Sequence, residues 1–281
     1  NNYFDLYKKI PEFKEQNYSM SLDEFKVIFW WEWAHRFLGR IIGISFLLPL
    51  IFFTIKLGLK KLSNLYFIFF LICFQGFIGW YMVSSGLIDR VDVSHFRLSI
   101  HLIIAFFIIS LILWNYLSLK IDRDFGSKFN NPAIFIFLIL IFAQIIIGAF
   151  VSGMDAGQIY NSWPLMGSSF YPNDNEIDNF FKLSAFSDPS LVQFMHRNLA
   201  YIILIFYLII LFKIYKKKIS NLYFAVKLVG LFLFIQIILG IYTLLSGAQI
   251  YLASMHQISS IFLVSASVYL FYLNSNQRPS N

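Results

Sequence analysis

The chain has 281 residues, of which 58% are hydrophobic and 13% charged, and its formal net charge is +7. This composition excludes an ordinary soluble domain, and recurring apolar runs of about 20 residues are long enough to cross a bilayer as helices. Because the runs are continuous rather than alternating, we predict an all-α polytopic membrane protein and not a barrel. The single cysteine, Cys73, excludes an intrachain disulfide or a thiolate metal site.

Seven membrane spans follow in chain order, at about 28–55, 65–84, 99–118, 133–152, 193–213, 222–246 and 253–273. Lysine and arginine gather in the loops on one side, which the positive-inside rule makes cytoplasmic, so the basic charge requires no nucleic-acid partner. These residues are Lys56, Lys60, Lys61, Lys120, Arg123, Lys128, Lys213, Lys216, Lys217, Lys218 and Arg278. We expect the outer side to carry residues 1–27 and the loop 153–192, and the cytoplasm to contain the loop 119–132 and the tail 274–281.

The two halves of the chain repeat each other. The dipeptide His-Arg occurs at 35–36 and again at 196–197, and the pattern Gln-x-x-x-Gly occurs at 75–79 and again at 236–240. Both recurrences have an offset of 161 residues. The same Gln-x-x-x-Gly pattern at 144–148 precedes the second unit, and its counterpart would lie before residue 1. The repeat therefore predicts two pseudo-symmetric four-helix bundles, with seven of eight helices in this sequence. Their bounds are 28–118 and 133–273.

Four of the five histidines occupy equivalent places, near the outer end of a span that runs inward. They are His35, His101, His196 and His256. Each half contains two of them on non-adjacent segments, which suits two facing ligands to haem iron across a bundle. Ionisable groups in membrane spans are costly and indicate function. His95 has no repeat partner and is expected in a loop.

The residue four positions after each of these histidines is small, which leaves clearance for a flat ligand on the same helix face. These residues are Gly39, Ala105, Ala200 and Ser260. A zinc ion would need further ligands that do not accompany the pairs. Close helix packing by small residues remains an alternative explanation.

Arginine is concentrated on the outer side, against the positive-inside trend. Arg36, Arg40, Arg97 and Arg197 are candidates for binding haem propionates, because guanidinium groups form paired hydrogen bonds with carboxylates. Snorkelling toward lipid headgroups is the alternative, and it applies most to Arg90.

The two halves differ beside their first histidine. Glu32 lies three residues before His35, whereas Gln193 stands at the same offset before His196. A haem that only carries electrons needs no neighbouring acid, whereas proton-coupled chemistry does. We therefore predict that the first half is reactive, with Glu32 as its catalytic residue. A simple ion pair between Glu32 and Arg36 is the alternative.

Several stretches of the chain form a family signature. Residues 24–43 read EFKVIFWWEWAHRFLGRIIG, residues 91–102 read VDVSHFRLSIHL, and residues 155–167 read DAGQIYNSWPLMG. With the histidine segments 194–201 and 253–262, they resemble the haem A synthase family of the long-loop bacterial and mitochondrial type. The similarity covers essentially the whole chain, although the family pattern normally has Asp where this chain has Gly167.

The resemblance implies an oxidoreductase acting on a CH or CH2 group. Its reaction would oxidise the C8 methyl group of haem O to a formyl group by successive hydroxylations with water-derived oxygen, giving haem A for terminal oxidases. It implies that His196 and His256 hold haem b, that His35 and His101 bind haem O as substrate, and that Glu32 is the essential acid.

The resemblance also implies a lipid bilayer around the chain, haem O synthase as donor and an electron acceptor that the sequence does not identify. The oligomeric state is left open between one copy and a homo-oligomer. The location is a bacterial inner membrane, with the mitochondrial inner membrane as alternative and the haem sites near the outer, periplasmic face.

Two other functions stay open from the residues alone. One is a di-haem membrane cytochrome that carries electrons, and the other is a haem-handling assembly factor without catalysis. A transporter is disfavoured, because its polar groups would lie near the middle of the membrane rather than at one face.

Overall fold

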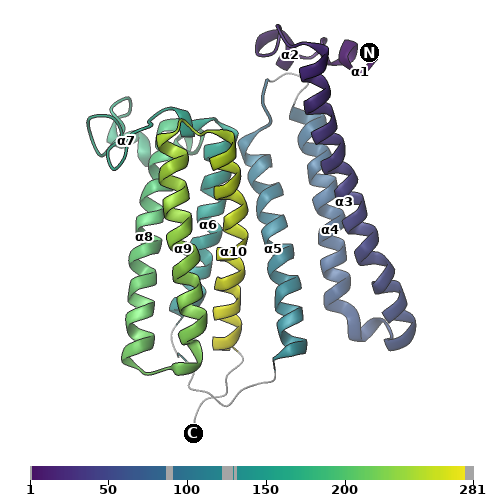
Figure 1. Ribbon diagram of the computed structural model, residues 1–281, viewed down its shortest axis with the longest axis vertical. Coiled ribbons are helices and arrows are strands. Elements are labelled where there is room, and N and C mark those ends of the chain that lie inside the picture. The colour runs from purple at the N-terminus through teal and green to yellow at the C-terminus, as the bar shows by residue number, and fades with distance from the viewer. Residues whose placement is uncertain (1, 87–90, 122–128, 130–131, 276–281) are drawn as a thin grey trace. The chain divides into compact units, whose positions relative to one another are not determined.

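The computed structural model describes residues 2–86, 91–121, 129 and 132–275. Within this part of the chain, seven helices are long and apolar enough to cross a membrane (Figure 1). The predicted all-α polytopic membrane fold is therefore confirmed. The charged residues Arg90, Arg123, Lys128 and Arg278 lie outside the described residues.

The seven long helices match the predicted spans and extend beyond most of them. They are α3 (Leu22–Leu57), α4 (Ser63–Gly86), α5 (His95–Lys120), α6 (Ala133–Gly153), α8 (Pro189–Lys216), α9 (Tyr223–Leu245) and α10 (Ile250–Ser275). The shorter helices are α1 (Asn2–Tyr7), α2 (Pro11–Glu15), α7 (Ile177–Phe180), η1 (Leu59–Leu62), η2 (Ala156–Gln158), η3 (Leu183–Ser187) and η4 (Ser220–Leu222). The prediction that His95 lies in a loop is wrong, because the Leu98 amide donates to the Ser94 carbonyl at 3.0 Å and closes a helical turn around it.

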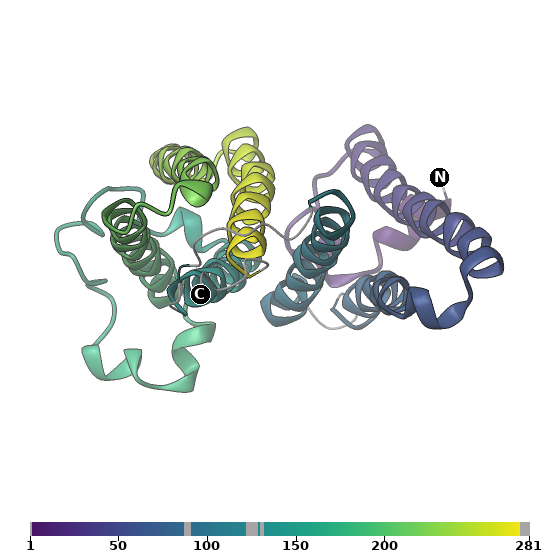
Figure 2. The ribbon, with the colours of Figure 1, turned by 90° about the horizontal axis from the view of Figure 1, so that it is seen from below.

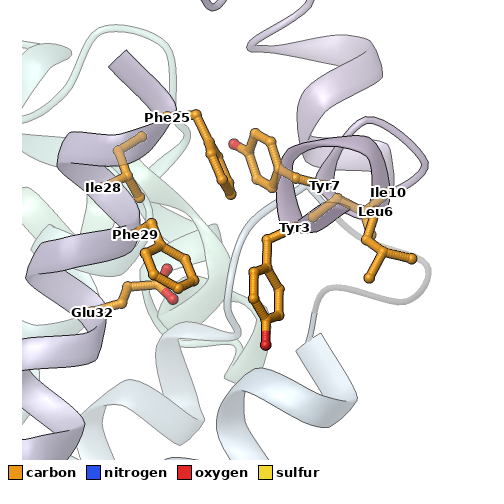
Figure 3. A pocket seen from close by; sticks show the side chains of 8 residues that line it. All are labelled: Tyr3, Leu6, Tyr7, Ile10, Phe25, Ile28, Phe29 and Glu32. Atoms are coloured by element: carbon orange, nitrogen blue, oxygen red, sulfur yellow. The ribbon is translucent and has the colours of Figure 1, made fainter. Parts of the chain in front are cut away.

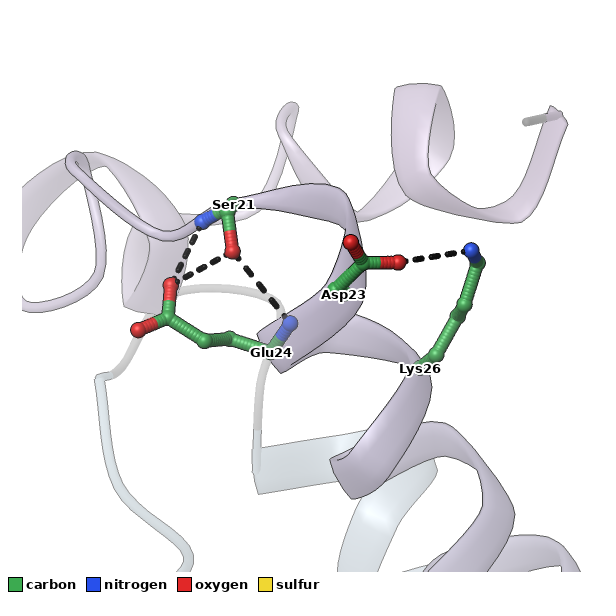
Figure 4. A network of polar contacts seen from close by, with 4 residues as sticks. All are labelled: Ser21, Asp23, Glu24 and Lys26. Atoms are coloured by element: carbon green, nitrogen blue, oxygen red, sulfur yellow. Dashed lines mark hydrogen bonds and ion pairs between the residues drawn. The ribbon is translucent and has the colours of Figure 1, made fainter.

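The helix α3 begins earlier than the predicted residue 28 because its first turn is capped. The Glu24 amide donates to the Ser21 hydroxyl oxygen at 3.3 Å, and the Ser21 amide donates to the Glu24 carboxylate at 2.8 Å (Figure 4). This capping box satisfies amides that a helix start otherwise leaves unpaired. In the same turn, Lys26 pairs with Asp23 at 2.8 Å. The polar first turn thus continues the helix beyond its apolar segment.

The first compact unit comprises residues 1–108. In it, α3 packs against α4, and the short helices α1 and α2 lie beside the start of α3 (Figure 1). Aromatic rings join α1 to α3 and α2 to α1. The ring of Phe25 lies 5.1 Å from that of Phe4 and 5.0 Å from that of Tyr7, centroid to centroid. These contacts fix the N-terminal segment beside the turns of α3 that precede Glu32.

The second compact unit comprises residues 109–281 and contains a four-helix bundle. The helix α8 contacts α6 and α9, and α10 contacts the same two helices, so the four close a ring. Seen from below, α8 and α10 occupy opposite corners of this ring (Figure 2). The interior is apolar, with side chains such as Phe137, Ile203 and Leu270 only 1% exposed. Side chains of α8 and α10 can therefore face each other across the bundle.

Ser21→Ala removes the capping hydroxyl and is expected to destabilise the first turn of α3 by about 1 kcal/mol, whereas Ser21→Gly should cost only about a few tenths. Hydrogen–deuterium exchange at the amides of residues 22–25 measures the difference. Exchange in Ser21→Ala equal to that of the unmodified chain would show that the hydroxyl does not cap this helix.

Candidate functional site

The first pair of predicted ligands lies together in the first unit. His35 of α3 and His101 of α5 have ring centroids 6.5 Å apart, with ring planes at 65°. A metal held between two imidazoles by bonds of about 2.0–2.1 Å would set the centroids about 6.3 Å apart. The observed separation fits two axial ligands of one iron atom.

The second pair lies in the four-helix bundle. His196 is near the start of α8 and His256 is near the start of α10, the two helices at opposite corners (Figure 2). Both side chains are half-buried. Facing histidines in a helix bundle are a common way to hold haem iron.

The donor set of each pair suits haem better than a bare metal ion. Among the residues that the structure describes, no three His, Cys, Asp or Glu side chains gather as a metal site. A zinc ion takes about four protein or water ligands, whereas haem brings its equatorial ligands with it. Space for a flat ring is present on α3, where a Cβ added at Gly39 would meet nothing within 4 Å.

Three glycines that the sequence analysis did not assign to these sites touch the predicted ligands. The pairs are Gly79 with His101, Gly148 with His196, and Gly240 with His256. A Cβ added at these glycines would lie 2.9, 3.1 and 3.1 Å, respectively, from the imidazole Cε1 atom. A larger residue would therefore have to displace the ring. The signal was present in the repeated Gln-x-x-x-Gly pattern, but spacing alone does not reveal which side chain the glycine faces.

The predicted propionate ligands of the first unit are accessible. Arg36 pairs with Glu32 at 3.4 Å, and both side chains are about half exposed. Such exposed pairs contribute about 0–1 kcal/mol, so this ion pair leaves Glu32 available for other interactions. Arg40 is exposed one turn further along α3, and Arg97 donates to the Ser85 hydroxyl at 2.6 Å.

In the second unit, the equivalent residues hold the loop between α6 and α8. Arg197 donates to the Ser162 carbonyl at 2.8 Å and to the Tyr160 carbonyl at 2.7 Å. Gln193 is 2% exposed and donates to the same Tyr160 carbonyl at 3.0 Å. A carboxylate at position 193 could only accept hydrogen bonds, so this contact requires the amide. Gln193 thus fixes the loop, whereas its counterpart Glu32 pairs with Arg36.

Glu32 lines a pocket of about 250 Å³ in the first unit (Figure 3). The other lining residues are apolar or aromatic: Tyr3, Leu6, Tyr7, Ile10, Phe25, Ile28 and Phe29. The close-up shows the carboxylate projecting from α3 beside the ring of Phe29. Glu32 is thus the one carboxylate among the residues that line this pocket.

Two ionisable groups on the N-terminal segment, Tyr7 and Glu12, have a raised pKa. Burial raises the pKa of Tyr7 to about 12, and its hydroxyl donates to Glu12 at 2.9 Å. Burial also raises the pKa of Glu12, and the negative charge of Glu32 adds to this effect. Asn17 donates to the Tyr7 hydroxyl oxygen at 2.9 Å. The negative charge of Glu32 therefore acts on an ionisable group of the segment beside its pocket.

The loop between α6 and α8 is held by its own polar network. The hydroxyls of Tyr160 and Ser190 donate to Asp174 at 2.8 and 2.6 Å. Although burial alone would raise it, these bonds hold the pKa of Asp174 below its usual value. Asp188 caps α8 by accepting from a first-turn amide at 3.0 Å. Gly167 has a φ of +72°, a conformation that glycine adopts more readily than the Asp of the family pattern.

Comparison with known proteins gives a consistent result. A family model described as cytochrome oxidase assembly protein (COX15-CtaA) matches residues 1–268. A protein named heme A synthase from Pelagibacter ubique (strain HTCC1062) is 51% identical over 278 residues, covering 98% of this chain and 82% of the relative. The heme A synthase of Rickettsia bellii (strain OSU 85-389) is 42% identical over 283 residues, covering 97% and 83% of the two chains. No solved structure matches.

Fold and site together define a multi-pass membrane protein with repeated histidine pairs suited to haem iron. The chain belongs to the cytochrome oxidase assembly protein family. Within it, the chain is a member of the haem A synthase family, as the sequence resemblance implied.

Gln193→Glu is expected to loosen the loop between α6 and α8, because it replaces a buried donor by an acceptor facing the Tyr160 carbonyl. Leaving such a group unpaired costs about 1–3 kcal/mol. Limited proteolysis of the reconstituted protein measures the loosening. Gln158→Glu, an exposed change in the same loop, is the control. Equal cleavage of the two variants would contradict the tethering role of Gln193.

Proposed function

We propose that this member of the haem A synthase family oxidises the C8 methyl group of haem O to a formyl group, through an alcohol, as an oxidoreductase acting on a CH or CH2 group. The observation that carries the proposal is the difference between two repeated sites. Glu32 lines an open pocket beside His35, whereas Gln193 is buried and bonded to a loop carbonyl beside His196. An ionisable group therefore stands at one site, and a purely structural amide stands at the other.

In this proposal, the two halves bind different haems. The half at 28–118 binds haem O as substrate through His35 and His101, and the half at 133–273 holds haem b through His196 and His256. Haem b, when bound there, would supply one-electron transfer. His35 is exposed, whereas its counterpart His196 is half-buried. The first site is therefore the more accessible of the two, which suits a substrate that enters and leaves.

We assign the proton chemistry to Glu32. Each hydroxylation adds one oxygen atom from water to the methyl carbon and releases two protons, while two electrons pass to an acceptor outside the chain. Glu32 accepts a proton from the water whose oxygen is added, as a general base does. Its pocket opens beside the N-terminal segment, and protons can reach solvent through this opening.

The proposed orientation places both haem sites near the outer, periplasmic face of a bacterial inner membrane. The lysines at the ends of α3, α5 and α8 support this, because they lie at the helix ends opposite the histidines. Arg36, Arg40, Arg97 and Arg197 would bind propionates there. Haem O synthase is the proposed donor, and the protein works in the bilayer as one copy or as a homo-oligomer.

Glu32→Gln is expected to bind haem but to lower haem A formation by about 10²–10⁴-fold, because the amide cannot accept the proton. Haems extracted from cells that also produce haem O are measured by HPLC. Haem O or its alcohol should accumulate. Glu15→Gln, an exposed acid of the N-terminal segment, should leave the product unchanged. Normal haem A output from Glu32→Gln would reject the role of this acid, and the absence of haem A from the parent chain would favour an electron carrier or assembly factor.

His256→Ala is expected to abolish the low-spin haem b spectrum, because one axial ligand of the second site is lost. Absorption and EPR spectra of the purified protein measure this change. His95→Ala provides the control, since His95 belongs to neither predicted pair. An unaltered low-spin spectrum in His256→Ala would reject the ligand assignment.

A further inference from the structure

The three histidine–glycine contacts share one ring orientation. In each, Cε1 is the ring atom nearest the added Cβ, and Nδ1 is the nearer of the two ring nitrogens. The Nδ1 atoms of His101, His196 and His256 are buried and, in the described part of the chain, have no hydrogen-bond partner of normal geometry. Nε2 is therefore the ring nitrogen that lies further from the neighbouring glycine.

In the second unit, a glutamine one turn before each glycine bonds to the histidine-bearing helix. The side-chain amide of Gln144 donates to the backbone carbonyl of His196 at 3.0 Å. The side-chain amide of Gln236 donates to the backbone carbonyl of His256, also at 3.0 Å. Each ligand is thus held at two points, by a glycine against its ring and by an amide against its backbone.

The first unit lacks the second of these contacts. Gln75 stands at the same offset from Gly79, yet its Oε1 atom is buried without a partner. Among the described residues, no hydrogen bond joins the Gln75 side chain to the backbone of His101. The glycine contact is therefore common to all three ligands, and the glutamine bond is confined to the second unit.

Gln144 also lies close to the imidazole itself. Its amide nitrogen is 3.0 Å from the His196 backbone carbonyl and 3.3 Å from Nε2 of the same ring. A ligand bound at Nε2 would take the place of the second contact and leave the bond to the backbone carbonyl intact.

We propose that Gln144 and Gln236 are positioning residues that clamp the ligands of a resident haem, and that the unclamped His101 permits exchange of substrate for product. The proposal rests on the proposed function, in which the second unit keeps haem b and the first turns over haem O. A cofactor that stays bound gains from ligands that are already ordered before binding. A site that must release its haem after each reaction gains from a ligand held less firmly.

The test uses the full chain with its haems, purified in nanodiscs. Gln144→Met and Gln236→Met keep the side-chain volume but remove the donor. Each is expected to alter the EPR signal of low-spin haem b and to raise the rate of haem b transfer to apomyoglobin by about twofold to tenfold, the factor that one hydrogen bond contributes. Gln75→Met, the matched control, should change neither. Unchanged haem b in both clamp variants, or an equal change in Gln75→Met, would overturn the proposal.

A second set of variants covers the case in which a methionine variant does not fold. Gly240→Ala should shift the EPR signal of haem b because its Cβ displaces the His256 ring, whereas Gly76→Ala meets nothing within 4 Å and should not. If Gly240→Ala leaves that signal unchanged, the ligand is not held in the way proposed. If the proposed function is wrong, the result differs from a failure of this proposal. The parent protein itself would then show no low-spin haem b signal for His256→Ala to remove.

Discussion

An imidazole inside an apolar helix bundle is destabilised when its polar atoms lack partners, and the candidate site depends on how this cost is met. Burying an unpaired polar group costs several kcal/mol in a medium that offers no water. In three of the four predicted ligands, the ring lies with Cε1 against a glycine of the neighbouring helix and with Nδ1 buried. In the proposed function, haem iron would complete the coordination of the remaining nitrogen.

The two units cover their histidines in different ways. In the second unit, Gln193 and Arg197 turn their donors toward carbonyls of one loop, which closes over the start of α8. In the first unit, the N-terminal segment packs through aromatic rings and leaves a pocket that contains the Glu32 carboxylate. The repeated histidines thus have different surroundings in the two units, a difference that agrees with the separate roles proposed for the two halves.

The sequence predicted the spans and the histidine pairs because both depend on strong periodic signals. Apolar runs locate helices, and His35 meets His101 as the repeat suggested. Local contacts moved two helix starts away from the predicted residues. The capping box at Ser21 makes α3 begin earlier, and one additional turn includes His95 in α5. The glycine contacts and the role of Gln193 could not be predicted, because they depend on which faces of two helices meet, and the hydropathy of spans apolar on every side contains no such information.

The histidine–glycine contacts have a consequence for how the helices align along their axes. On the same face of α9, one turn before and one turn after Gly240, lie Gln236 and Leu244. If α9 shifted along α10 by one turn, one of these larger side chains would replace the bare backbone that receives the ring of His256. Leucine-rich and isoleucine-rich surfaces are nearly uniform and would otherwise permit several alignments in lipid. The glycine that receives the imidazole therefore favours a single axial alignment of α9 on α10.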